Sequence, residues 1–145
     1  MNKLLFTDKY LLKYKNDIKS LSNFWNFRKL FIFFINNDID STIDQDIIKS
    51  YTSDWSNIPG GYADILVRPK SSKECAIILK LCDSCKVPIT ISAGRTNLTG
   101  SATPFGGLIL STQNLLSPEI TVDIKDKTVI SPVGLQLEKM RNEII

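Results

Sequence analysis

The stretch SAGRTNLTGSATPFGG, residues 92–107, decides how this chain is interpreted. Small and hydroxyl-bearing residues make up most of it, and Arg95 is its only charged residue. Converging backbone N–H groups can form an anion-binding hollow, and small residues let a bulky diphosphate reach them. Gly94 and Gly100 can take positive φ, which a turning loop often needs. The stretch predicts a phosphate-binding loop, although composition alone is equally compatible with ordinary connecting structure.

The loop does not have the spacing of either of the two best-known nucleotide-binding motifs. There is no GxxxxGK[ST] of the Walker type, and no GxGxxG that opens a helix. Instead the loop joins two expected strands, VPITI (87–91) and GGLILST (106–112). Loop amides, rather than a helix N-terminus, would therefore hold the phosphate. Arg95 is left with two roles, pairing with a phosphate or anchoring the loop from outside.

The segments on either side of the loop predict an α+β fold. ADILVRP (63–69) is typical of a buried strand, and Ser71 and Glu74 have the spacing of a capping box before an amphipathic helix. This strand–helix–strand unit implies a parallel pair. After the loop, ITVDI (120–124) and TVIS (128–131) predict a hairpin, and a last helix begins near residue 135.

The first fifty residues predict a helical leader. Apolar residues recur at helical spacing in two runs, residues 10–25 and 27–35, and Thr42 or Asp44 can cap a short third helix. We expect residues 1–50 to form the leader and residues 51–145 the main domain. Leu30–Ile35 is expected to form an exposed apolar patch if the domain lacks a further half.

Composition limits the possible classes of protein. A chain of 145 residues with 43% apolar and 23% charged residues suits one globular domain. The net charge of +3 is scattered, which argues against nucleic acid as a partner. The longest apolar run is too short to predict an integral membrane segment. Three cysteines without an export signal favour reduced thiols and a cytoplasmic location.

Two clusters suggest metal or redox chemistry, and each has a simpler interpretation. Cys82 and Cys85 have a CxxC spacing, but without histidine or a second CxxC we expect helix packing. The aspartates of residues 38–46 lack the glycine and glutamate of a calcium loop, so a solvated loop is expected. The absence of histidine removes the commonest general base and metal ligand.

Residues 51–145 together resemble the FAD-binding domain of the PCMH type, found in vanillyl-alcohol-oxidase-like flavoproteins. The similarity is greatest to the branch of glycolate oxidase FAD subunits and of D-lactate and D-2-hydroxyglutarate dehydrogenases. In order along the chain, the matching positions are Tyr51, Asp54, Trp55, Pro69, Ser71, Glu74, Val87, Pro88, the loop, Ser111, Val129, Gly134 and Leu137. The matching region corresponds to the N-terminal half of that domain, a small mixed sheet with flanking helices.

The resemblance implies FAD as the cofactor, with the loop wrapped around its pyrophosphate. The cofactor-binding residues it implies are Ser92, Ala93, Gly94, Arg95, Thr96, Asn97, Thr99, Gly100, Ser101 and Gly134. Ala93, Asn97 and Ser101 stand where family loops commonly have glycine. Trp55 is left with two interpretations, a cofactor contact or a core or interface residue. No catalytic residue and no metal ligand is assigned.

The function implied by the resemblance is that of an FAD-dependent oxidoreductase acting on a D-2-hydroxy acid such as lactate, glycolate or 2-hydroxyglutarate. Family enzymes also need the second half of the FAD domain and a cap domain with histidines, so this chain alone is expected to be inactive. The alternative is a non-catalytic remnant or split-gene product, whose partner would be a separately encoded C-terminal half.

Overall fold

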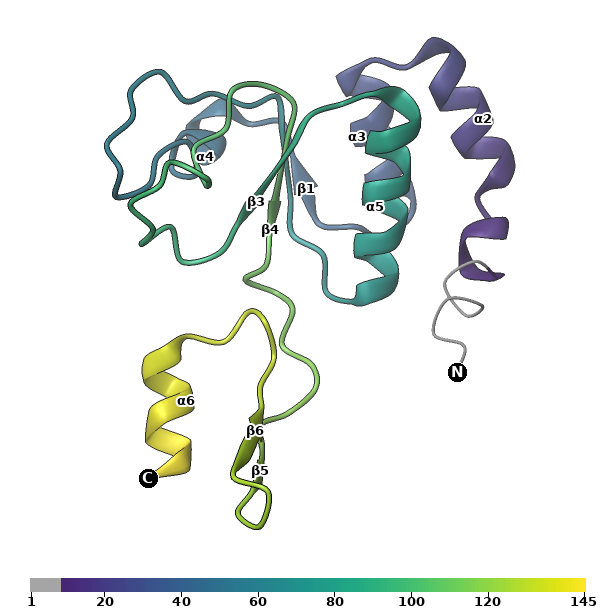
Figure 1. Cartoon of the computed structure of the whole chain (residues 1–145). Helices are drawn as coiled ribbons and strands as arrows, with labels where there is room; N and C mark the ends of the chain where they lie inside the picture. Colours follow the sequence, from purple (N-terminus) through teal and green to yellow (C-terminus); the bar gives the residue numbers. More distant parts are fainter. Residues whose placement is uncertain (1–8) are drawn as a thin grey trace.

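The computed structural model describes residues 9–145, which form an α+β fold (Figure 1). Helices α2 (Lys15–Phe24), α3 (Phe27–Asn36) and α5 (Ser72–Cys85) lie on one side of a four-stranded sheet, and the short α4 (Gln45–Lys49) lies on the other. The sheet contains β1 (Ser41–Thr42), β2 (Ile65–Val67), β3 (Ile89–Ser92) and β4 (Leu108–Ser111). The predicted fold class is confirmed.

The strand order of this sheet is β1-β2-β4-β3. Strands β2 and β3 each pair in parallel with β4, whereas β1 is antiparallel to β2. The prediction that the strands around α5 form a parallel pair is therefore wrong in one respect, since β4 lies between them. The middle strand, β4, comes from the chain segment after the loop. The local spacing of apolar residues does not show which strands will be neighbours in the sheet.

The sheet is buried because both of its faces are covered. Ile65 and Val67 point to one face and pack in a core with residues of α3 and α5. Leu66, between them, points to the other face and packs with Ile48 of α4 and Ile109 of β4. This alternation follows from the two-residue period of a strand. Continuous apolar runs such as LILS are what a doubly covered parallel sheet requires.

The helices that cover the first face begin where the sequence supplies caps. The Ser71 hydroxyl accepts from the N–H of Glu74 at 3.3 Å, and the Glu74 carboxylate accepts from the N–H of Lys70 at 2.8 Å. The capping box is thus confirmed, with the glutamate reaching one residue further back than usual. Asn26 caps α3 in the same way, and Asp44 caps α4 while Thr42 accepts from the N–H of Asp44.

The helical leader shares its core with the sheet. Leu30, Phe33 and Phe34 of α3 are buried against the same cluster as α5, while Ile32 and Ile35 are half exposed. The expectation of an exposed apolar patch at Leu30–Ile35 is wrong for the first three, because these helical positions face the sheet. The boundary between leader and domain at residue 50 stays a prediction.

The two cysteines of the CxxC pair are packing residues, as expected. Cys82 and Cys85 lie on the buried face of α5 and are free thiols. Burial, then the neighbouring Cys85, raises the pKa of Cys82 to about 12, and burial also raises the pKa of Cys85. Both thiols are protonated at neutral pH, so neither is poised for redox chemistry or metal ligation.

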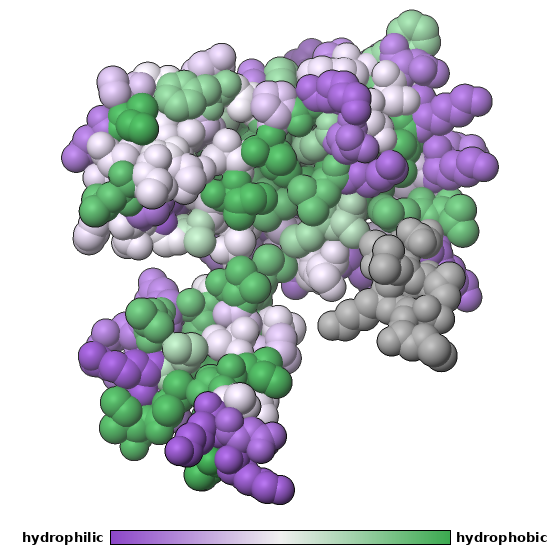
Figure 2. Space-filling model, in the orientation of Figure 1, coloured by the Kyte–Doolittle hydropathy of each residue, from purple (hydrophilic) through white to green (hydrophobic). Residues whose placement is uncertain are grey.

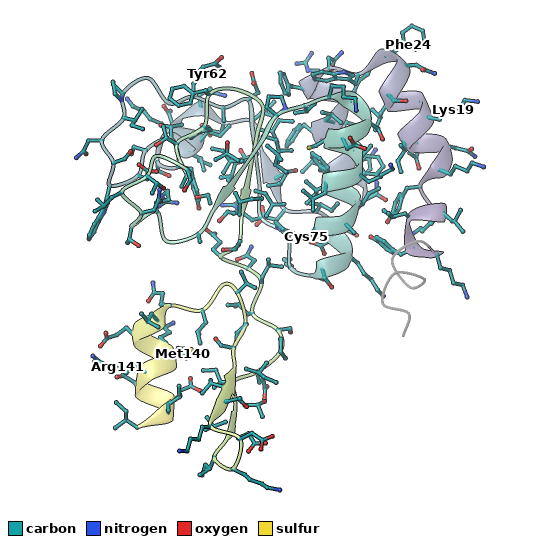
Figure 3. All side chains as sticks on the ribbon, viewed as in Figure 1. Lys19, Phe24, Tyr62, Cys75, Met140 and Arg141 are labelled. Carbon is teal, nitrogen blue, oxygen red and sulfur yellow. The ribbon has the colours of Figure 1, made fainter. Side chains whose placement is uncertain are left out.

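The C-terminal segment forms a separate small unit below the sheet (Figure 1). It consists of the predicted hairpin, β5 (Thr121–Asp123) and β6 (Thr128–Ile130), followed by α6 (Leu137–Ile144). All six strand residues are exposed, and α6 buries none of its own. Figure 2 shows apolar residues on the surface of this unit, and Figure 3 shows Met140 and Arg141 on α6, well away from the sheet. Within residues 9–145, no helix has the length and apolar character to cross a membrane.

Candidate functional site

The register of the sheet brings the glycine-containing loop and the segment after β4 together. Ser92, the last residue of β3, is paired with Ser111, the last residue of β4. The two chain segments that follow leave the sheet at its carboxyl edge, where ligands bind in many α/β sheets. A cleft of about 530 Å³ opens there. Its walls are Ala93, Gly94, Thr96, Thr112, Gln113 and residues 133–138.

The near half of the loop, residues 93–96, borders this cleft with few protein contacts of its own. Within residues 9–145, none of the backbone N–H groups from 94 through 101 donates to a protein acceptor. A Cβ added to Gly94 would meet only the Thr96 side chain, at 3.9 Å or more. Packing within the protein therefore does not explain glycine at 94, whereas a ligand close to the backbone would.

Two loop residues have a positive φ. Gly100 uses this freedom of glycine (φ 76°), whereas at the start of the loop Arg95 rather than Gly94 takes it (φ 55°). Positive φ is uncommon for a residue with a side chain and costs about 1 kcal/mol. At Arg95 two contacts stabilise it: its carbonyl accepts from the N–H of Trp55 at 3.2 Å, and its guanidinium lies over the Tyr51 ring.

The far half of the loop, residues 97–102, is organised around the buried carboxylate of Asp54. One oxygen of Asp54 accepts from the Asn97 side chain at 2.7 Å and from the N–H of Ala102 at 3.2 Å. The other accepts from the N–H and the hydroxyl of Ser56. These hydrogen bonds, led by that of the Ser56 hydroxyl, lower the pKa of Asp54 to about 2. Asp54 therefore stays ionised and fixes this half of the loop to the segment after α4.

Two glycines of the predicted site are explained by the protein itself. Gly100 has a positive φ (76°), which favours glycine, and a Cβ there would also displace the end of the Ile58 side chain. A Cβ on Gly134 would overlap with the carbonyl oxygen of Thr112 and come within 2.9 Å of that of Gln113. Gly134 thus lets the segment after β6 lie directly against the end of β4, which closes the cleft from that side.

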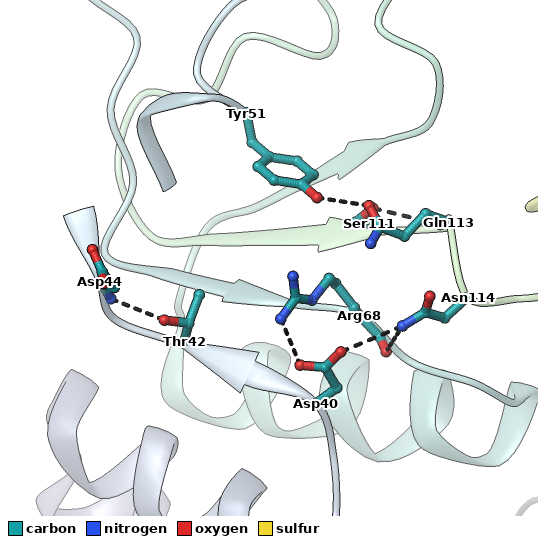
Figure 4. A network of polar contacts seen from close by, with 8 residues as sticks. All are labelled: Asp40, Thr42, Asp44, Tyr51, Arg68, Ser111, Gln113 and Asn114. Atoms are coloured by element: carbon teal, nitrogen blue, oxygen red, sulfur yellow. Dashed lines mark hydrogen bonds and ion pairs between the residues drawn. The ribbon is translucent and has the colours of Figure 1, made fainter. Parts of the chain in front are cut away.

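Arg95 connects the loop to Tyr51, which belongs to a polar cluster at the end of β4. Figure 4 shows this cluster, with Tyr51, Ser111 and Gln113. The centre of the Arg95 guanidinium lies 4.5 Å from the centroid of the Tyr51 ring. The Tyr51 hydroxyl donates to Oε1 of Gln113 at 2.6 Å, and the Ser111 hydroxyl donates to the same oxygen at 3.3 Å. Gln113 in turn lines the cleft. The contact of the Arg95 guanidinium with the Tyr51 ring favours the role in which Arg95 anchors the loop.

A second, smaller hollow of about 270 Å³ lies on the other side of Gly94. Asp54, Trp55 and Arg95 line it together with Ser50 and Ser53. Trp55 is 66% exposed, so its interpretation as a core residue is wrong, because the residues after α4 turn outward around the loop.

Asp40, one of the aspartates of residues 38–46, forms polar contacts close to the end of β4. Its carboxylate pairs with the Arg68 guanidinium at 2.7 Å and accepts from the side chain of Asn114 at 3.4 Å (Figure 4). The ion pair ties β1 to the end of β2. In the described part of the chain, no three side chains of the His, Cys, Asp and Glu types gather as metal ligands.

The ten predicted site residues fall into three groups. Four line the cleft, namely Ala93, Gly94, Thr96 and Gly134. Four belong to the far half of the loop, namely Asn97, Thr99, Gly100 and Ser101, and the side chains of three of these bond to one another. Arg95 lines the smaller hollow, and Ser92 is buried at the end of β3 with its hydroxyl unpartnered within the described residues.

Sequence reasoning missed Thr112 and Gln113, which also line the cleft. Their position directly after an expected strand that pairs beside the loop was the available signal. It could be used only with knowledge that β3 and β4 are neighbours. Glu138 on the opposite wall was missed as well, and it pairs with Arg141 at 2.7 Å.

Comparison with known proteins places this cleft in a family. A family model described as an FAD binding domain matches residues 63–144, more than half of the chain. This range includes both the loop and the segment around Gly134 that closes the cleft.

The chain is also similar to curated relatives. The chain is 31% identical over 98 residues to a mitochondrial D-2-hydroxyglutarate dehydrogenase of Danio rerio, covering 67% of this chain and 18% of that protein. It is 31% identical over 77 residues to a D-lactate dehydrogenase of Archaeoglobus fulgidus, covering 52% and 17%. A D-lactate dehydrogenase of Anaerostipes hadrus is 28% identical over 102 residues, covering 70% and 22%. The chain thus spans about a fifth of the length of these relatives.

Solved structures share the fold at low identity. The variant D396N of Physcomitrella patens BBE-like 1 matches with a TM-score of 0.59 at 10% identity, over 73% of this chain and 23% of that one. The xylooligosaccharide oxidase of Myceliophthora thermophila, solved with xylobiose, matches with a TM-score of 0.59 at 14% identity, over 77% and 24%. At these identities the likeness concerns the fold alone.

Proposed function

The chain belongs to the FAD binding domain family, and from that premise we propose that the cleft beside the glycine-containing loop holds the pyrophosphate of FAD. The observation that carries the proposal is the near half of the loop. Gly94 has open space where a side chain would stand, and the N–H groups of residues 94–96 have no protein acceptor within residues 9–145. Unengaged amides beside a hollow suit a diphosphate.

The charges around the cleft also fit a diphosphate. The acidic residue on its wall, Glu138, is paired with Arg141, so its charge is largely balanced. Asp54 lies behind the loop, where four donors offset its charge. We assign Ala93, Gly94, Thr96 and Gly134 to direct contact, and Asn97, Thr99, Gly100 and Ser101 to holding the loop in shape. Ser92 and Arg95 support the loop from β3 and from Tyr51.

We further propose that the chain is the FAD-binding part of an oxidoreductase acting on a D-2-hydroxy acid. Support comes from the relatives named as D-lactate and D-2-hydroxyglutarate dehydrogenases. Bound FAD would supply the acceptor for a hydride from the hydroxyl-bearing carbon. The chain's own residues would bind and orient that cofactor. A cytoplasmic location is proposed from the free buried thiols, with the mitochondrion of the zebrafish relative as the alternative.

A second candidate is a non-catalytic or split product that works with a separately encoded C-terminal half. The observation favouring such a partner is the C-terminal unit, whose apolar side chains are largely uncovered. Val133 is 68% exposed, Leu137 74% and Ile124 86%. Further domain sequence, covalently continuous or separately encoded, would cover these side chains and complete the cofactor site.

The test is an FAD titration of the purified chain, followed by the flavin absorbance spectrum and by equilibrium dialysis. We expect a resolved, bound-flavin spectrum for the unaltered chain. Gly94→Val should weaken binding at least about tenfold, since its side chain would occupy the space where the diphosphate approaches. Leu98→Ala, which trims an exposed side chain of the same loop, is the control and should bind normally. A free-flavin spectrum at high protein concentration, or equal binding by both variants, would refute the proposal.

A further inference from the structure

The side-chain amide of Gln113 is held in one orientation at the wall of the cleft. We propose that this amide donates a hydrogen bond to an acceptor oxygen of the cofactor, and that Tyr51 and Ser111 position it for that role. The inference rests on the proposed function and deepens it, because it adds a binding residue from β4's side of the cleft.

The hydrogen bonds of Gln113 use only one end of its amide. Oε1 accepts from the Tyr51 hydroxyl at 2.6 Å and from the Ser111 hydroxyl at 3.3 Å (Figure 4). An amide oxygen has two lone pairs, so these two donors saturate it. Nε2 has no acceptor within residues 9–145, although Gln113 lines the cleft and is exposed to it. The Gln113 side chain therefore has two N–H donors available to a ligand in the cleft.

The surroundings of Tyr51 favour this orientation of the amide. The Arg95 guanidinium lies over the phenol ring, and a cation in that position draws electron density from the ring and strengthens its O–H as a donor. A reversed amide would leave the Tyr51 O–H without the Oε1 acceptor that it now has at 2.6 Å. Tyr51 is itself packed against the cluster of Ile48, Leu66 and Ile109.

This arrangement connects the loop to the opposite side of the cleft. Arg95 belongs to the loop, Tyr51 follows α4, and Gln113 follows β4, so three separate segments meet in one line of contacts. In FAD, acceptor oxygens occur on the diphosphate and on the flavin carbonyls. The amide can serve either group, and both belong to the same hydrogen-bonding chemistry.

Side-chain amide resonances of the full ¹⁵N-labelled chain provide the direct test. FAD, ADP and riboflavin are titrated separately, and the Gln113 side-chain signals are compared with those of Gln45, an exposed glutamine of α4. We expect the Gln113 signals to move with FAD and the Gln45 signals to stay. Movement with ADP indicates a phosphate oxygen, and movement with riboflavin indicates a flavin carbonyl. Saturation of the flavin spectrum without movement at Gln113 overturns the inference.

Two matched variants give an independent readout. Gln113→Glu keeps an oxygen for the Tyr51 hydroxyl but replaces the two N–H donors by a second, charged oxygen, and FAD affinity should fall about tenfold or more. Gln45→Glu makes the same chemical change away from the cleft and should bind as the unaltered chain does. If the unaltered chain does not bind FAD, the proposed function fails and this inference with it. If it binds and the two variants are equal, only this inference fails.

Discussion

The two halves of the glycine-containing loop differ in what holds them. The far half, residues 97–102, is tied to the rest of the protein by the Asp54 carboxylate and by contacts among its own side chains. The near half, residues 93–96, has a strained residue at Arg95 and a glycine at 94 that packing does not require. Contacts within the protein thus account for the conformation of residues 97–102, but they do not account for the glycine at position 94.

This difference separates structural from ligand-facing roles within a single motif. A glycine whose absent Cβ would collide with protein, such as Gly100, is explained without any ligand. A glycine beside a hollow with nothing nearby, such as Gly94, is explained by a ligand that comes close to the backbone. Family resemblance alone would assign both to the cofactor. Variants at the two positions should accordingly affect different properties.

The largest effect is expected for Gly100→Val. The new side chain would sit at φ 76°, where a β-branched residue is strained, and would displace the end of the Ile58 side chain, so the free energy of unfolding should fall by about 1–3 kcal/mol. Urea unfolding followed by circular dichroism measures the change. Gly60→Val is the control, since Gly60 also has positive φ (84°) but has open space around it. Equal midpoints for the two variants would remove the collision with Ile58 from the explanation.

The next effect concerns Asp54 and appears as a dependence on pH. Hydrogen bonds, first from the Ser56 hydroxyl, lower its pKa in the folded state from 3.8 to about 2. A lowered pKa means that the contribution of Asp54 to stability is complete above pH 3.8 and is lost as the pH falls through 2. Asp54→Asn should lower the urea midpoint at pH 6 and should flatten the acid part of the stability curve.

Asp17→Asn serves as the control for the Asp54 variant. Asp17 lies in the first turn of α2, outside the loop network. Its replacement removes a carboxylate without touching the contacts of Asp54, so the urea midpoint at pH 6 should stay close to that of the unaltered chain. A profile for Asp54→Asn as steep as that of the unaltered chain would mean that the carboxylate does not pin the loop.

The smallest effect is expected for Arg95→Lys. Lysine keeps the positive charge but lacks the planar group that lies over Tyr51, so stacking worth about 0.5–1 kcal/mol is lost. The free energy of unfolding should fall by about that amount, and FAD affinity should fall a few-fold because the loop is held less firmly. Lys49→Arg, the reverse exchange at the end of the nearby α4, should leave affinity unchanged. A loss of tenfold or more would indicate that Arg95 itself contacts the cofactor.

Local features of the fold were predictable from the sequence because they depend on neighbouring residues. The strand around Ile65, the cap at Ser71 and the hairpin of β5 and β6 each follow from patterns only a few residues long. The insertion of β4 between β2 and β3 was not predictable in this way, since strand order depends on contacts between distant segments. Asp54 is a similar case, because its partners Asn97 and Ala102 lie far along the chain.

The sequence by itself determined that a short, nearly uncharged loop joins two buried strands, because small residues and apolar runs have local conformational consequences. Only the tertiary structure decided which loop residues face the cleft and which support the loop. It also brought Gln113 into the cleft and placed Tyr51 between Gln113 and Arg95. The physical reason is that these roles depend on which side chains lie within hydrogen-bonding distance, and that is fixed by the register of β3 against β4.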